Sequence, residues 1–192
     1  DFNSKIDHSA YAISKHFSEM EVWRASAEGL NTVIVNPGLI IGSGNWKESS
    51  GTLFMEFEKN DYTFSGGTSY VDVRDVAQIS IELMEKNIFG ERFILVSESA
   101  KYEEIGNSIR QKLGKSPMKL LPNVVLKVGF YLNLLFGWLF SPLKMANKVN
   151  IKSVTEFNKI SNKKIKEKLN YQFIPLEESL AFHVENYKKD RS

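Results

Sequence analysis

The sequence predicts an α/β protein with one good core and a small appended lobe. Segments with helical spacing of apolar residues alternate with short strand-like runs through the first hundred residues. Residues 32–35 read Thr-Val-Ile-Val, and a continuous β-branched run is typical of a strand buried on both faces of a parallel sheet. The length of 192 residues and the hydrophobic content of 42% are those of an ordinary globular chain.

The first expected element is a helix at residues 9–27, in which Tyr11, Lys15 and Glu19 follow one another at a spacing of four residues. This spacing places the three side chains on one helix face. Gly29 ends the helix, because glycine readily adopts the left-handed backbone that commonly follows a helix.

The strand at residues 32–35 ends at Pro37 and Gly38, which together favour a turn. Residues 42–50 contain Gly, Ser, Asn and one Trp, and we expect a loop there. Residues 52–59 predict a short amphipathic helix, because their apolar residues recur at helical spacing.

Residues 70–73 predict a short extended piece, and Asp72 and Asp75 can cap and charge the start of the next helix. That helix presents four apolar residues at helical spacing: Val76, Ile79, Leu83 and Met84. Residues 92–96 then predict a second buried strand.

The second half of the sequence predicts mainly helices. In order, we expect a helix at residues 102–113, a brief strand at 118–121, an apolar helix from Val124, a basic helix at 161–169 and a final amphipathic helix at 176–187. The apolar stretch at 124–140 is interrupted by Lys127 and Asn133 and is short for a membrane span. It favours a buried or interface helix, and contact with a membrane surface stays open.

The composition excludes several functions. The formal net charge of +2 is too small to indicate a nucleic-acid partner. The absence of cysteine excludes a thiol nucleophile and a Cys-based metal site, and it fits a cytoplasmic location. His8, His16 and His183 lack the spacing of metal ligands, so we expect packing or surface roles and no metal. The lysines within residues 163–168 favour a solvated helix face.

Tyr11 and Lys15 are the strongest candidates for catalysis. An ammonium group one helical turn from a phenol favours the phenolate, so this tyrosine can exchange a proton with a substrate near neutral pH. The spacing alone is weak support, because a chain with 7 tyrosines and many lysines contains such pairs by chance. Its value comes from the strand that follows it and ends in Asn36-Pro37-Gly38.

In this order, the motifs resemble an extended short-chain dehydrogenase/reductase of the NAD-dependent epimerase/dehydratase family. Residues 41–46 (Ile-Gly-Ser-Gly-Asn-Trp) resemble the loop after the fifth Rossmann strand, and residues 70–77 resemble the Val-x-Asp-Val-Ala segment. Residues 161–169 and 175–180 resemble the C-terminal signature, so the likeness covers nearly the whole chain. The Asn-Trp loop and residues 73–75 are most similar to the dihydroflavonol-reductase-like branch.

The resemblance implies a fold and a division of the chain. The fold would be the C-terminal portion of a Rossmann-type doubly wound parallel sheet, plus a small, mostly helical substrate-binding lobe. Residues 1–100 would form the C-terminal half of the Rossmann-like domain with interleaved lobe segments. Residues 101–192 would form most of the substrate-binding lobe and the C-terminal helices.

The resemblance also implies roles for individual residues. Tyr11 would be the general acid/base, and Lys15 would hold the nicotinamide ribose of NAD or NADP and favour the phenolate. The residues against the nicotinamide would be Tyr11, Lys15, Asn36, Pro37, Gly38, Leu39 and Ile40. Those facing a small-molecule carbonyl or alcohol substrate would be Ser43, Trp46 and Tyr70.

Each position also has a purely structural interpretation. Pro37 and Gly38 can simply end a strand, Asp72 and Asp75 can be helix caps, and Trp46 can be a packed loop residue. Thr68 occupies the place where many nucleotide-sugar epimerases carry an arginine that grips a diphosphate. This departure favours a small carbonyl or alcohol substrate over a sugar nucleotide.

The cofactor's pyrophosphate site is not found in this sequence. No Gly-x-x-Gly-x-x-Gly occurs, and the chain starts ten residues before Tyr11. We therefore expect a fragment that is inactive alone, whose strand at 32–35 is covered by a homo-oligomer or by the missing N-terminal half. The alternatives are a non-catalytic binding or interaction module on the same scaffold, or a nucleotide-sugar epimerase or dehydratase.

Overall fold

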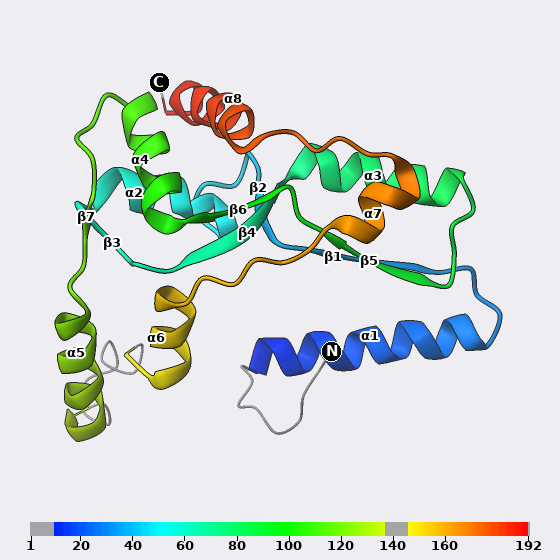
Figure 1. Cartoon of the computed structure of the whole chain (residues 1–192), viewed down its shortest axis with the longest axis horizontal. Coiled ribbons are helices and arrows are strands. Elements are labelled where there is room, and N and C mark those ends of the chain that lie inside the picture. The colour runs from blue at the N-terminus through cyan, green and yellow to red at the C-terminus, as the bar shows by residue number, and fades with distance from the viewer. Residues whose placement is uncertain (1–9, 137–145, 192) are drawn as a thin grey trace.

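The computed structural model describes residues 10–136 and 146–191 (Figure 1). The helices are α1 (Ala10–Ala27), α2 (Thr52–Lys59), α3 (Val73–Glu85), α4 (Tyr102–Lys112), α5 (Asn123–Phe136), α6 (Lys148–Thr155), α7 (Lys163–Leu169) and α8 (Leu176–Lys189), with a short 3-10 helix at Ser49–Gly51. The strands are β1 (Val33–Pro37), β2 (Leu39–Ile41), β3 (Tyr62–Thr63), β4 (Gly67–Asp72), β5 (Glu91–Leu95), β6 (Glu98–Lys101) and β7 (Lys119–Leu120). The α/β alternation predicted from the sequence is confirmed.

The strands pair mainly in parallel. β1 pairs with β5, so that Val35 lies opposite Phe93, and β2 pairs with β4, so that Ile40 lies opposite Val71. β3 and β7 form a third parallel pair, whereas β6 joins β4 in the antiparallel direction. Among the described residues, β1 has a strand partner on one side only.

Two hydrophobic cores hold these elements together. The α8 core gathers Ile41, Phe54, Phe57, Tyr70, Ala100, Ile105, Ile109, Met118, Leu176, Leu180, Val184 and Tyr187. The α3 core gathers Val71, Ile79, Leu83, Phe93, Leu95, Ile165 and Leu169. β4 connects the two, because successive strand residues point to opposite faces, so Tyr70 enters one core and Val71 the other. Both cores combine early and late segments of the chain.

Several elements differ from the sequence-based expectation. Strand β4 begins at Gly67, and Val73 starts helix α3 instead of ending the extended piece. Helix α6 and strands β2, β3 and β6 were not predicted. Helix α6 and strand β6 show no apolar pattern of their own, and β2 and β3 have only three and two residues. Strand β6 is polar, and pairing with β4 holds it extended, with the hydroxyls of Ser69 and Ser99 2.7 Å apart. Residues 137–140 of the predicted apolar helix lie outside the described residues.

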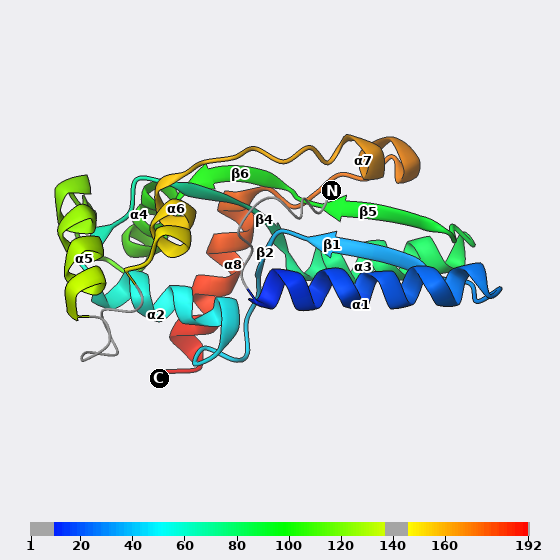
Figure 2. The ribbon, with the colours of Figure 1, turned by 90° about the horizontal axis from the view of Figure 1, so that it is seen from below.

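Helix α1 lies along the β1–β5 pair and runs antiparallel to β1 (Figure 2). Its N-terminal turn therefore lies at the same end as the last residue of β1 (Figure 2). None of its residues is fully buried, and the apolar side chains of Ile13, Phe17 and Met20 are exposed. Gly29 follows the helix with a φ of +100°, as predicted for a helix-ending glycine.

Arg110 is a structural residue that the sequence did not reveal. Its guanidinium is buried and donates to the carbonyl oxygens of Phe57 (3.1 Å) and Asn60 (2.7 Å) and to the carboxylate of Asp61 (2.8 Å). These bonds satisfy backbone carbonyls at the end of α2, which would otherwise be left without donors. Arg110 thereby fixes α4 to the α2–β3 turn.

In the part of the chain that the structure describes, no helix combines the length and the apolar character that a membrane crossing requires.

Candidate active site

Tyr11 and Lys15 lie one turn apart on the same face of α1. The Lys15 ammonium nitrogen is 5.8 Å from the centre of the Tyr11 ring. Both side chains are exposed, with 73% of the Tyr11 surface accessible. The phenol and the ammonium therefore share one face of α1, as the spacing predicted, and both are exposed.

Glu19 fixes the position of this helix face on the sheet. Its carboxylate accepts hydrogen bonds from Asn36 in β1 (3.3 Å), Arg92 in β5 (2.8 Å) and Trp23 in its own helix (3.2 Å). Burial opposes ionisation, but these hydrogen bonds outweigh it, so the pKa of Glu19 lies below its ordinary value. The sequence placed Glu19 on the Tyr11 face but gave no sign of this anchoring role.

The strand end predicted to face the nicotinamide is shaped by contact with β4. Gly38 donates its backbone N–H to the carbonyl of Leu95 at 2.9 Å. A Cβ at Gly38 would lie 2.4 Å from the carbonyl oxygen of Ser69, so only glycine fits this close approach. Pro37 is exposed at the end of β1. Close packing against β4 therefore explains why residue 38 is glycine, whether or not a cofactor binds there.

The remaining residues of this stretch are held in the sheets. Asn36 pairs with Ile94, while Leu39 and Ile40 pair with β4, and all three side chains are partly buried. The stretch from Asn36 to Ile40 thus leaves one parallel pair and enters another, and Gly38 forms the joint between them.

Ser43 begins a hydrogen-bonded chain that ends in the protein interior. Its hydroxyl lies 2.5 Å from Nδ1 of His183 and accepts from the amide of Asn186 at 2.9 Å. On the other side of the ring, Nε2 of His183 lies 3.2 Å from the Asp72 carboxylate. Ser43 is exposed, whereas His183 and Asp72 are each 1% exposed. The chain joins the loop after β2 to helix α8.

Asp72 is the hub of this network. It caps α3 by accepting from the backbone N–H of Arg74 at 2.8 Å, and it also accepts from the Arg74 guanidinium at 2.7 and 2.9 Å. The Ser179 hydroxyl donates to it at 2.7 Å. Burial raises the pKa of Asp72, but the hydrogen bonds from Arg74, His183 and Ser179 prevail and hold it far below its ordinary value. The helix-cap interpretation of Asp72 is confirmed.

Asp75 binds a different segment. Its carboxylate accepts from the Tyr171 hydroxyl at 2.9 Å and from the backbone N–H of Ile174 at 3.1 Å. Burial raises the pKa of Asp75, and these two hydrogen bonds only partly oppose it. Asp75 therefore ties the first turn of α3 to the chain that leads into α8.

Of the three predicted substrate-facing residues, Trp46 is partly buried against other aromatic rings and Tyr70 is buried. Trp46 makes edge-to-face contacts with Phe54 and Tyr187, at centroid distances of 5.2 and 5.0 Å, and its indole N–H donates to Asp190 at 2.8 Å. Tyr70 is 1% exposed, and its hydroxyl has no hydrogen-bond partner among the described residues. Ser43 is the most accessible of the three.

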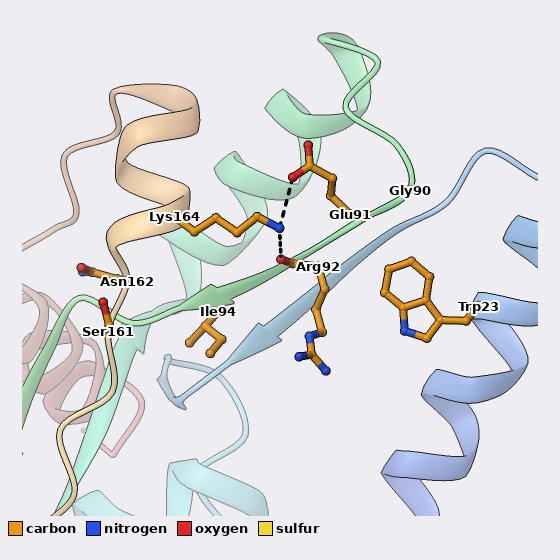
Figure 3. Close-up of a pocket in the computed structure, with 8 residues that line it drawn as sticks. All are labelled: Trp23, Gly90, Glu91, Arg92, Ile94, Ser161, Asn162 and Lys164. Carbon is orange, nitrogen blue, oxygen red and sulfur yellow. Dashed lines mark hydrogen bonds and ion pairs between the residues drawn. The ribbon is translucent and has the colours of Figure 1, made fainter. Parts of the chain in front are cut away.

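A pocket of about 560 Å³ lies further along α1, between Trp23, β5 and the segment that leads into α7 (Figure 3). Lys164 enters it but is held by Glu91 at 3.1 Å and by the carbonyl of Arg92 at 2.9 Å (Figure 3). The pocket lining does not include Tyr11 or Lys15. Its cations are already paired with carboxylates, so it offers no evident anion site.

Within residues 10–136 and 146–191, no group of three or more His, Cys, Asp or Glu side chains could hold a metal ion.

Sequence comparison gives limited information. No family model matches the chain. The chain is 30% identical over 98 residues to "Sterol demethylase protein B" of Methylococcus capsulatus, a match that covers 50% of this chain and 30% of that protein.

Comparison with solved structures shows the fold. The chain is similar to a nucleoside-diphosphate-sugar epimerase from Pseudomonas aeruginosa (TM-score 0.72, 15% identity, 95% of this chain and 56% of that one). It is also similar to UDP-glucose 4-epimerase with UDP-glucose from Thermotoga maritima (TM-score 0.71, 20% identity, covering 97% of this chain and 56% of that one). A third similar structure is dTDP-glucose 4,6-dehydratase from Bacillus anthracis in complex with NAD (TM-score 0.69, 14% identity, covering 97% of this chain and 54% of that one). The chain has this Rossmann-like α/β fold and spans about half the length of these proteins.

Proposed function

We propose that this chain carries the proton-transfer residues and the substrate side of an NAD(P)-dependent oxidoreductase. The reaction is hydride transfer between nicotinamide and a carbonyl or alcohol group. The observation that carries the proposal is the Tyr11–Lys15 pair, which is exposed on one face of α1 at the end where β1 terminates (Figure 2). The carboxyl ends of parallel strands are where ligands bind in folds of this kind.

Tyr11 is the acid/base in this proposal. Its hydroxyl donates a proton to the substrate oxygen as the carbonyl is reduced, and accepts one as the alcohol is oxidised. The Lys15 ammonium stabilises the phenolate that forms in the first case and orients the cofactor ribose. Glu19 supports both residues indirectly, because it fixes the rotation of α1 on β1 and β5.

The residues present fit one end of the cofactor. An exposed ammonium and phenol beside a strand end suit a ribose and a nicotinamide ring, whereas the sequence has no Gly-x-x-Gly-x-x-Gly for the pyrophosphate. A bound NAD or NADP supplies or accepts the hydride. The similar structure that contains NAD supports this choice of cofactor. In our proposal the pyrophosphate site lies outside the residues of this chain.

Two observations favour a small carbonyl or alcohol substrate. Thr68 stands where many nucleotide-sugar epimerases carry a diphosphate-binding arginine. In addition, the relative with 30% identity is named for a sterol, and a sterol bears a hydroxyl group. A sugar nucleotide is the second candidate, because two of the similar structures are epimerases named for such substrates. Ser43 is the best-placed substrate contact, since its hydroxyl is the accessible end of the Ser43–His183–Asp72 chain.

The test uses this chain joined to a segment that supplies a glycine-rich dinucleotide-binding loop. Tyr11→Phe is expected to lower kcat by about 100-fold or more and to leave the cofactor Kd nearly unchanged, because only proton transfer is removed. Tyr62→Phe is the matched control, since Tyr62 is also exposed, at 54%, but lies in β3. Unchanged turnover in Tyr11→Phe would remove the assignment.

The chain alone gives a second test. Without a glycine-rich loop at a helix N-terminus, it is expected to bind the dinucleotide very poorly and to show no measurable turnover. Calorimetric titration with NAD(H) and NADP(H) measures this directly. Micromolar affinity would contradict the view that the pyrophosphate site lies outside this chain.

A further inference from the structure

Helix α5 presents an apolar surface that nothing in the described chain covers. The exposed apolar side chains are Leu134 (70%), which lies on the Lys127 side of the helix, and Val124 (67%), Val125 (51%), Val128 (51%), Tyr131 (62%) and Leu132 (41%), and we call the last five the α5 stripe. At 100° per residue, these five positions fall within one third of the helix circumference. They therefore form one continuous surface instead of scattered exposed residues.

Beside the α5 stripe, Gly129 and Asn133 contact Ala146, which lies two residues before α6. A Cβ at Gly129 would lie 3.5 Å from the Cβ of Ala146, and the Asn133 amide donates to the Ala146 carbonyl at 3.4 Å. Figures 1 and 2 both show α5 at one end of the molecule, with α6 beside it and away from α1 and β5.

The charged residues in the sequence around α5 have one sign. Between Glu104 and Glu156 the sequence contains no Asp or Glu but eight Lys or Arg residues, although the whole chain is nearly balanced at +2. Lys119, Lys127 and Lys148 are exposed, and within the described residues no ion pair engages them. A surface that combines an apolar stripe with unopposed lysines suits a partner that is both apolar and anionic.

We infer that α5 docks on an anionic phospholipid bilayer, lying in the plane of its surface. The valines and Leu132 enter the boundary between headgroups and acyl chains, Tyr131 sits at the headgroup level, and Lys127 reaches the phosphates. Lys127 and Asn133 interrupt the apolar residues of α5, which suits a position at the bilayer surface. Acidic lipids attract the lysines, and the absence of carboxylates removes the opposing repulsion.

The experiment is co-sedimentation of the purified chain with vesicles. Vesicles of phosphatidylcholine that contain a minority of phosphatidylglycerol are expected to bind the chain, and vesicles of phosphatidylcholine alone are expected to bind it at least about tenfold more weakly. The double variant Val124→Ser/Val128→Ser is expected to lose about tenfold or more in binding to the acidic vesicles. Its matched control is Ile81→Ser/Met84→Ser, which removes two exposed apolar side chains, 52% and 61% accessible, from α3.

The charge contribution has its own pair of variants. Lys127→Glu/Lys148→Glu is expected to weaken binding to acidic vesicles by about tenfold at low salt, with a smaller effect at high salt. Lys47→Glu/Lys59→Glu makes the same change of charge at exposed lysines elsewhere and is expected to have little effect. These variants change surface charges only, so they test the proposal even if the valine variants fold poorly.

Depth can be measured directly, because the chain has no cysteine of its own. A spin label on Val128→Cys is expected to become accessible to dissolved oxygen and shielded from a water-soluble relaxation agent when acidic vesicles are added. A label on Met84→Cys is expected to stay in water. Absence of binding, equal binding to neutral vesicles, or a concentration-dependent dimer in light scattering that Val124→Ser/Val128→Ser abolishes would each overturn the inference.

Discussion

Replacing Asp72 with Asn tests how much one buried carboxylate contributes to this fold. Asp72 is 1% exposed and accepts hydrogen bonds from the backbone and the guanidinium of Arg74, from the Ser179 hydroxyl and from the His183 ring. The Asn side chain has the same shape but carries no charge and turns one acceptor oxygen into a donor. It can keep the helix cap while losing the contacts made by the other oxygen.

The expected loss at pH 7 is about 3 kcal/mol. The charge-assisted bond to Arg74 contributes about 1.5–3 kcal/mol, and the low end applies because the Arg74 side chain is 38% exposed and stays hydrated. The Ser179 bond adds about 1 kcal/mol, and an amide facing these donors adds a further penalty. For a chain of 192 residues this corresponds to a fall in Tm of roughly 6–12 °C.

The pH dependence separates the charge from the packing. The folded pKa of Asp72 lies far below its unfolded value near about 4, so its contribution is fully present above that value and is lost as the pH falls below it. The difference in unfolding free energy between the native chain and Asp72→Asn is therefore expected to narrow as the pH falls from about 5 to about 3. Urea unfolding followed by circular dichroism at several pH values measures this difference.

Two variants serve as controls. Ser179→Ala removes one donor to Asp72 and is expected to cost about 1 kcal/mol with no comparable dependence on pH. Glu28→Gln neutralises an exposed carboxylate paired with Arg24 and is expected to cause no measurable change. A difference below about 1 kcal/mol for Asp72→Asn at pH 7, or one that is unchanged at acidic pH, would refute the reasoning.

Three further substitutions have expected outcomes in the same urea assay. Gly38→Ala places a Cβ 2.4 Å from the Ser69 carbonyl oxygen and is expected to lower the unfolding free energy by about 1–3 kcal/mol. Its control, Gly129→Ala, has room for a Cβ in its helix and is expected to be neutral or stabilising. Equal effects of the two variants would show that the close contact between Gly38 and β4 does not affect stability. Arg110→Met leaves the carbonyls at the end of α2 without their donor and is expected to cost about 3 kcal/mol, and a neutral result would contradict its structural role. Tyr70→Phe removes a buried hydroxyl without a described partner and is expected to change stability by less than about 0.5 kcal/mol; a larger loss would reveal a partner for that hydroxyl.

The sequence predicted the longer elements whose own residues carry a pattern, but not the short apolar strand β2. The β-branched run at 32–35 became most of β1, and the apolar spacing after Asp75 became α3, because each pattern matches the face that the element buries. Strand β6 was missed because Glu98–Lys101 is polar and extended only through pairing with β4. Helix α6 carries no strong apolar periodicity that would have predicted it.

In the candidate site, too, only the contacts between residues close in the sequence could be predicted. A four-residue spacing suffices to place Tyr11 and Lys15 on one helix face, so their proximity was predictable. The Ser43–His183–Asp72 chain was not, because it joins residues 140 and 111 positions apart in the sequence. Such contacts depend on how α8 packs against β2 and β4, which no local pattern specifies.

The two parts of this molecule that we assign to function depend on different physical supports. The Tyr11–Lys15 face is oriented by one partly buried carboxylate, Glu19, which joins α1 to both β1 and β5. Because α1 buries no side chain completely, few apolar contacts are available to fix its rotation. The α5 stripe needs no such anchoring contact, because the whole molecule can rotate freely until the stripe faces the bilayer. Loss of the Glu19 contacts should therefore affect catalysis without altering vesicle binding, whereas changes in the α5 stripe should do the reverse.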